Sequence, residues 1–84
     1  MPGKIRVGKV EHFYDKIGVA AVVVEDEISI GDTLIFMHGN EEVRQKVTSI
    51  QINHINVQHG FKGDSIGIKV DQQVDEGSDV YKEL

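Results

Sequence analysis

The sequence contains no cysteine, and this absence excludes several classes of protein. Without a thiol the chain cannot form a disulfide framework, a zinc finger, an iron–sulfur site or a cysteine nucleophile. Long apolar runs are also missing, because the longest one spans only 17–24, far fewer than the ~20 residues that cross a bilayer. The N-terminal residues MPGK lack the apolar stretch of a signal peptide. We therefore expect a cytoplasmic protein that does not bind a membrane.

Basic residues are scarce as well. The chain has 9 Lys and Arg against 14 Asp and Glu, which gives a net charge of −5. Domains whose main role is to grip a nucleic-acid backbone are usually basic overall, so this balance disfavours such a role. The 84 residues are 39% hydrophobic and 27% charged, as in an ordinary globular protein. We expect a single domain over residues 1–84 with one hydrophobic core.

Short segments rich in Ile and Val, separated by Gly beside Asp, Asn, Ser or Lys, predict an all-β fold. Residues 17–25 are almost continuously apolar and rich in β-branched side chains, which predicts a strand buried on both faces. Gly39 and Asn40 form a turn signal between two strands. The remaining strands are predicted from their alternation at 4–10, 33–38, 65–70 and 80–84.

The middle of the chain has two interpretations. Residues 40–50 could form a helix, because their apolar side chains lie at helical spacing for two turns. The run VTSIQI at 47–52, which begins in that segment, however, forms helices poorly. We therefore predict a strand that extends over 43–57 and bends at a bulge. Alternation would place Ile50, Ile52 and His54 on one face of it.

Three similar motifs precede predicted strands, with the sequences IGDT, KGDS and EGSD at 30–33, 62–65 and 76–79. Gly accepts the positive φ of a tight turn, and the next Asp or Ser can hydrogen-bond to the turn backbone. We predict that these motifs are strand-entry turns. The side chains expected in the core are Ile5, Val7, Val19, Ala21, Val23, Leu34, Val47, Ile50, Ile52, Ile66 and Ile68.

Five segments occur in an order and at distances that resemble a known domain. They are KV at 9–10, ISIGDTL at 28–34, VTSIQ at 47–51, KGDSIGI at 62–68 and EG at 76–77. Together they resemble the β-barrel second domain of translational GTPases such as elongation factor Tu. Similar barrels are attached to collagenase-like peptidases or stand alone. The resemblance implies a single small closed antiparallel β-barrel of about six strands.

The resemblance also has consequences for ligands. Translational GTPases bind their nucleotide through a GxxxxGK[ST] loop, and this sequence has no such motif, so we expect no nucleotide binding. In elongation factor Tu the barrel holds the aminoacyl end of the tRNA. Carried over by position, the contacting residues of this chain would be Asn53, His54 and Ser65.

Metal sites and catalytic groups are not indicated. The acidic runs 25–27 and 75–79 lack the alternating ligands and closing Glu of a calcium loop. A general acid–base group around the first turn, residues 12–16, would have no nucleophile motif to accompany it. We predict no catalytic residue, no metal and no cofactor. The histidines lack zinc-site spacing and are expected to be solvated or loop residues: His12, His38, His54 and His59.

The N-terminal stretch is basic through Lys4, Arg6 and Lys9. Such residues could contact RNA phosphates in a salt-dependent way. The C-terminal stretch 71–84 is acidic and could instead pair with them, if the first and last strands are neighbours as barrel closure requires.

These observations predict a non-enzymatic binding module, related to translation by resemblance, that contacts RNA, the ribosome or a protein partner. A protein or ribonucleoprotein partner is expected, and direct RNA contact is possible. The alternative is an accessory barrel subunit of an enzyme such as a collagenase-like peptidase. A small enzyme acting alone is the third hypothesis. The residues expected to make the contact are Lys4, Arg6, Lys9, Asn53, His54 and Ser65.

Overall fold

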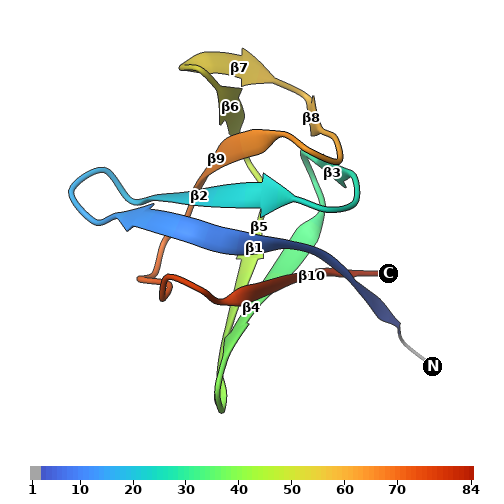
Figure 1. The fold of residues 1–84 in the computed structure, drawn as a ribbon, viewed down its shortest axis with the longest axis vertical. Coiled ribbons are helices and arrows are strands. Elements are labelled where there is room, and N and C mark those ends of the chain that lie inside the picture. Colours follow the sequence, from blue (N-terminus) through green and yellow to red (C-terminus); the bar gives the residue numbers. More distant parts are fainter. Residues whose placement is uncertain (1–2) are drawn as a thin grey trace.

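A computed structural model describes residues 3–84 and confirms the all-β class: the chain forms ten short strands that pair antiparallel (Figure 1). Eight of them make one sheet in the order β5-β4-β10-β1-β2-β9-β6-β7, and β3 pairs with β8 separately. The strands are β1 Lys4–Tyr14, β2 Val19–Val24, β3 Ile28–Ser29, β4 Thr33–His38, β5 Glu41–Lys46, β6 Ile50–Ile52, β7 Ile55–Val57, β8 His59–Gly60, β9 Ser65–Lys69 and β10 Asp79–Glu83. Within the described range, no helix has the length and apolar character needed to span a membrane.

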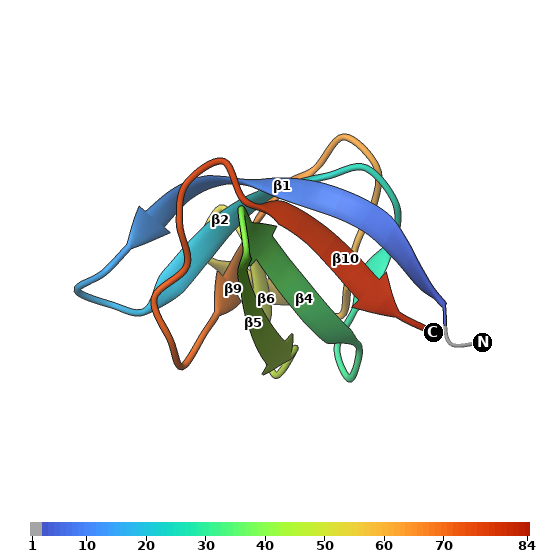
Figure 2. The same ribbon diagram turned by 90° about the horizontal axis from the view of Figure 1, so that it is seen from below.

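The large sheet is open, so the prediction of a closed barrel is wrong. β5 and β7 lie at its two ends, and no strand ladder joins them within residues 3–84. The sheet curls instead. β4 and β5 run steeply across β1 and β2 in Figure 1, and Figure 2 shows β1 and β10 arched over them. The physical reason lies in the middle of the chain, where the strand expected to help close the barrel is broken into three.

The segment 43–57 does not form one bent strand. β5 confirms that its first part is a strand and not a helix, but pairing stops after Lys46 and resumes in the short hairpin of β6 and β7. Asn53 and His54 connect that hairpin with φ of 52° and 66°. Positive φ at both central residues defines the type I′ turn that tight hairpins prefer. His54 therefore lies at a chain reversal and not on a strand face shared with β6.

The predicted strand-entry turns are confirmed. In the first of them, Asp32 Oδ2 accepts a hydrogen bond from Ser29 N at 2.7 Å. In the second, Asp64 Oδ2 accepts one from Phe61 N at 2.9 Å. A positive φ at the third turn residue is typical of type II turns and favours Gly. The three glycines lie just before β4, β9 and β10, with φ of 97° at Gly31, 94° at Gly63 and 83° at Gly77.

The core lies inside the curl of the sheet, and most of the predicted core residues belong to it. Strand β2 is the exception, because its buried side chains are Ala20, Val22 and Val24. The three residues of β2 that were predicted to be buried point the other way, and β2 is buried on one face only. Of the other predicted residues, Val7, Leu34, Val47, Ile50, Ile66 and Ile68 are buried, while Ile5 and Ile52 pack against the core and are partly buried.

Candidate functional site

The outer face of the sheet carries an apolar strip on β2, formed by Val19, Ala21 and Val23. An antiparallel sheet that covers a core with one face usually presents polar residues on the other. Here Val23 is 37% exposed, and Ile17 in the preceding turn is 61% exposed. Exposed apolar side chains that gather in one place are typical of interaction surfaces.

A groove lies in this face because two small residues are neighbours across the strands. Ala21 on β2 lies opposite Gly67 on β9, and Gly67 lies opposite Gln51 on β6. The flanking rows carry larger side chains, so the middle row forms a floor below them. The resulting β2–β9 groove has a volume of about 480 Å³ and is lined by Tyr14, Ile17, Val19, Ala21, Gln51, Asn53, His54, Ser65, Ile66 and Gly67.

One side of the groove is apolar and the other is polar. Tyr14 and Ile17 come from the end of the β1–β2 hairpin, whereas Gln51, Asn53 and His54 come from the β6–β7 hairpin. Gln51 Nε2 donates to Asn56 Oδ1 at 3.0 Å, which leaves the Gln51 side-chain oxygen available as an acceptor. Among the contacts of residues 3–84, the side chains of Asn53 and His54 make no hydrogen bond or ion pair. The groove therefore combines an apolar floor with polar groups that can still bind.

The structure brings together three of the residues singled out from the sequence. Asn53, His54 and Ser65 all line the groove. Lys9 lies on the same face of the sheet, since it pairs with Val23, which in turn pairs with Ser65. The Ser65 hydroxyl donates to Glu11 Oε1 at 3.2 Å at this end of the groove.

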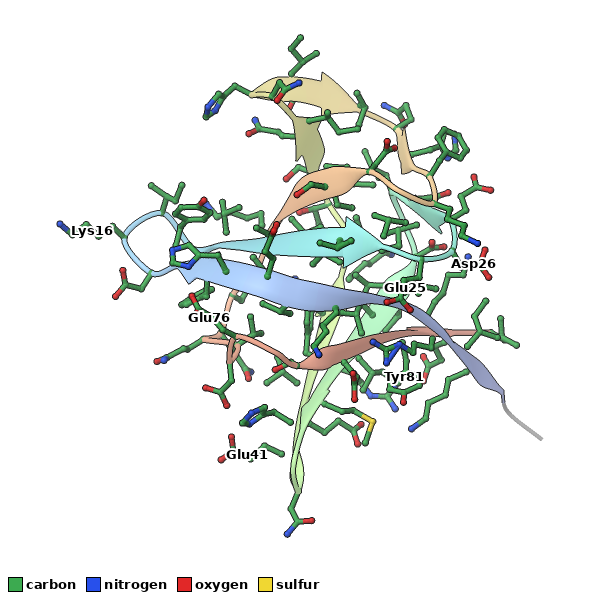
Figure 3. All side chains as sticks on the ribbon, viewed as in Figure 1. Lys16, Glu25, Asp26, Glu41, Glu76 and Tyr81 are labelled. Carbon is green, nitrogen blue, oxygen red and sulfur yellow. The ribbon has the colours of Figure 1, made fainter. Side chains whose placement is uncertain are left out.

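The other two basic residues lie further along β1 and serve the pairing of β1 with β10. Arg6 forms ion pairs with Asp79 at 2.8 Å and Glu25 at 3.0 Å. The Lys4 Nζ lies 5.2 Å from the centre of the Tyr81 ring; Figure 3 shows Glu25 and Tyr81 on either side of β1. The basic beginning and the acidic end of the chain therefore do lie together, as the charge pattern predicted, although the sheet is open.

Three of the four histidines contact carboxylates and anchor loops. His12 contacts Glu76, and His38 Nδ1 lies 3.3 Å from Asp75 Oδ2. The two contacts attach the segment between β9 and β10 to strands β1 and β4. Figure 3 shows Glu76 below the end of β1. These histidines are about half exposed, as expected for solvated residues, but His12 lies on β1 and His38 ends β4, so they are paired strand residues and not loop residues. Nowhere in the described part of the chain do three His, Asp or Glu residues gather in a way that could hold a metal ion.

One cluster contains the residue types of a hydrolase but not its geometry. Ser29 Oγ lies 2.8 Å from His59 Nδ1, and Glu27 Oε2 lies 3.3 Å from the same nitrogen. In a catalytic triad the imidazole contacts the nucleophile with one nitrogen and the carboxylate with the other. Here the serine hydroxyl and the Glu27 carboxylate both contact the same imidazole nitrogen, Nδ1. The cluster joins β3 to β8, and its arrangement differs from that of a catalytic triad.

Sequence reasoning missed the floor of the groove. It placed Ala21 in the core and assigned no role to Gly67. The available signal was Gly67 itself, because a glycine inside an alternating strand marks a place where the surface is open or another chain approaches closely. A Cβ atom at this position would lie 3.2 Å from Val19 Cγ1, which is tighter than an ordinary contact.

Comparison with known proteins identifies a relative by sequence. No family model matches the chain. The chain is 38% identical over 79 residues to an uncharacterized protease of Methanocaldococcus jannaschii, and the match covers 93% of this chain but only 19% of the protease.

Two solved structures share the fold. The C-terminal domain of a candidate U32 peptidase from Geobacillus thermoleovorans matches with a TM-score of 0.87 and 18% identity, over 95% of this chain and 93% of that domain. The selenomethionine variant of the same domain matches with a TM-score of 0.84 and 17% identity, over 89% and 95% of the two chains.

These findings correct the resemblance to translation factors. The relative and both structures are proteases or peptidase domains, so the assignment to translational GTPases is wrong, and the aminoacyl-tRNA contact implied for Asn53, His54 and Ser65 no longer has a basis. The shared Gly-Asp segments misled because they encode turn geometry, which any β fold can use. The peptidase alternative agrees better with the relatives.

Proposed function

We propose that this domain is a non-catalytic accessory module of a U32-peptidase-like protein and binds to another part of such a protein. The observation that carries the proposal is the coverage of the match. Nearly the whole domain aligns with a protease, yet it accounts for only 19% of that protease. The domain thus corresponds to one unit of a larger protein whose remaining parts are available to contact it.

The structure supports a binding role through the β2–β9 groove. Its lining offers apolar surface together with amide, imidazole and hydroxyl groups, which are the groups that recognise polypeptides. The Ser65 hydroxyl at one end of the groove donates to the Glu11 carboxylate of this chain, so a carboxylate is an acceptor that fits this end of the groove.

The proposal is tested with the M. jannaschii relative from which the matching 79-residue segment has been removed. Isothermal titration calorimetry is expected to show binding of this chain to the truncated relative with one-to-one stoichiometry. The intact relative is the matched control, because its own segment should occupy the surface and weaken binding by about tenfold or more. Absence of binding to a folded truncated relative overturns the proposal.

Folding of the truncated relative is checked by circular dichroism. A second measurement covers the case in which truncation unfolds it: a chimera carries this chain in place of the relative's own segment. The chimera is expected to unfold in one cooperative step. Unfolding of the module as an independent unit at its own midpoint would argue against docking.

A further inference from the structure

We propose that the β2–β9 groove binds an extended segment of the peptidase-like partner, in which an apolar side chain sits over Ala21 and Gly67 and an acidic side chain two residues away contacts Lys69. This inference rests on the proposed function and names the surface and the chemistry of the contact. Three features of the groove support it: its shape, its hydrogen-bonding groups and its charge.

The shape of the groove suits a single inserted side chain. The floor formed by Ala21 and Gly67 is low, while Val19 and Ser65 carry larger side chains in the rows beside it. A volume of about 480 Å³ accommodates an aliphatic or aromatic side chain together with the backbone that carries it. Ile17, exposed at 61%, would lose its contact with water in the complex.

The polar side of the groove suits a polypeptide backbone. This side presents the amide groups of Gln51 and Asn53 and the imidazole of His54. Within residues 3–84, the side chains of Asn53 and His54 make no hydrogen bond or ion pair. An extended segment exposes backbone N–H and C=O groups that these side chains can satisfy. The type I′ turn fixes the backbone of Asn53 and His54 at the tip of the β6–β7 hairpin, so little backbone entropy is lost when their side chains bind.

The charge near the floor selects an acidic side chain. Lys69 lies two residues from Gly67 on the same face of β9 and pairs with Val19. It is exposed, and no ion pair involves it among residues 3–84, whereas Arg6, Arg44 and Lys82 each face a carboxylate. Same-face neighbours on a strand lie about 7 Å apart. An extended partner has the same spacing, so its apolar and acidic side chains would be two residues apart.

The opposite end of the groove carries a carboxylate as well as a lysine. Lys9 lies there beside Val23, but the carboxylate of Glu11 is held at the same end by Ser65. This carboxylate would repel an acidic side chain of the segment. Lys69 lies at the other end, beside Val19 of the groove lining, so the acidic side chain is expected there and the direction of the segment follows.

Two matched pairs of variants test the inference by titration against the truncated relative. Ala21→Phe fills the floor, while Val23→Phe places the same side chain on the same strand and face outside the groove lining. Ala21→Phe is expected to weaken binding by about tenfold or more, and Val23→Phe by less than about threefold. Lys69→Glu is expected to weaken binding at low salt, whereas Lys62→Glu in the preceding turn should not.

Folding of each variant is measured by thermal unfolding. Ser65→Trp blocks the groove from its rim and replaces Ala21→Phe if that variant unfolds. A photo-crosslinking amino acid at position 54 then identifies the bound segment. The expected crosslink is to a stretch of the partner with an acidic residue two positions from an apolar one.

The outcomes separate the two proposals. If the wild-type chain binds the partner and all groove variants bind equally well, the groove inference is overturned and the accessory role stands. If the wild-type chain does not bind, both fail. If light scattering shows a homodimer that Ala21→Phe dissolves, the groove is occupied by a second copy of the chain, and the inference of a peptidase segment is overturned.

Discussion

Gln45 on the edge strand β5 accepts a hydrogen bond from the backbone N–H of Asp71 through its side-chain oxygen at 2.8 Å. Its Nε2 donates to the Lys46 carbonyl at 3.0 Å, so both ends of the buried amide are satisfied. β5 and the segment after β9 are not joined by any strand ladder of the described chain. A single side chain thus links two parts of the fold that a closed barrel would have joined through its backbone.

Replacement of Gln45 by Leu is expected to lower the free energy of unfolding by about 1 kcal/mol, because the Asp71 N–H would lose its hydrogen-bond partner at a part-buried position. Urea denaturation measures the change. Gln72→Leu is the matched control, since Gln72 is exposed and the variant should stay within about 0.5 kcal/mol of the wild type. Equal stability of the two variants would show that the Gln45 link is dispensable.

Replacement of Gly8 by Ala should destabilise the β1–β2 pairing. A Cβ atom at Gly8 would lie 2.5 Å from the Val23 carbonyl oxygen and 2.9 Å from Val22 Cγ1, so the backbone would have to move. We expect a loss of about 1–3 kcal/mol in the free energy of unfolding, measured by urea denaturation.

The control for this variant is Gly39→Asn. Gly39 has a φ of 61°, a Cβ atom added there would meet no other atom within 4 Å, and Asn tolerates this backbone conformation. The control should change stability by less than about 1 kcal/mol. A neutral Gly8→Ala variant would mean that the two strands separate easily at this point.

Local chemistry made much of this fold predictable. Strand β4 has the predicted bounds, the Gly39–Asn40 hairpin is present, and the three strand-entry turns occur where Gly and the following residue indicated them. The buried face of β9 was also correct, because Gly67 and Lys69 mark its other side unambiguously.

Other features depended on tertiary structure. β2 has apolar residues on both faces, so its periodicity could not show that Val22 points inward and Ala21 outward. The Asn53–His54 turn lacks the glycine that usually marks a type I′ turn. The groove depends on the register that places Ala21 beside Gly67, and no local pattern encodes that pairing because the two residues are far apart in the sequence.

Asp64→Ala should weaken the turn that leads into β9. The Asp64 carboxylate accepts the Phe61 N–H at 2.9 Å, and its loss leaves that donor to water. We expect a decrease of about 1 kcal/mol in the free energy of unfolding, measured by thermal or urea denaturation. Asp64→Asn keeps an acceptor oxygen and should recover most of the loss. If Asn is as damaging as Ala, the charge and not the hydrogen bond stabilises the turn.

Arg6→Met should cost stability in a salt-dependent way, because Arg6 is paired with both Glu25 and Asp79. These pairs are partly exposed, so we expect a loss of about 1 kcal/mol or less, which shrinks as salt is added to the urea titration. Lys9→Met, at a residue without an ion pair in the described structure, is the control and should show no such dependence. A loss at Arg6 that is insensitive to salt would point to packing of its aliphatic stem instead of charge.

His54→Gly should separate stability from binding. His54 has a φ of 66°, a conformation that costs a residue with a side chain but not glycine, and Asn-Gly is the preferred type I′ pair. We expect the variant to gain about 0.5–1 kcal/mol in the free energy of unfolding, after allowance for the greater freedom of glycine in the unfolded chain.

The same change removes an imidazole from the groove, so affinity for the truncated relative should fall. His54→Asn, which tolerates the turn and keeps a polar side chain, should retain more of the binding. A variant that is more stable and binds unchanged would show that His54 is only a turn residue; one that is more stable and binds more weakly would show that the turn gives up stability to present a side chain to the partner.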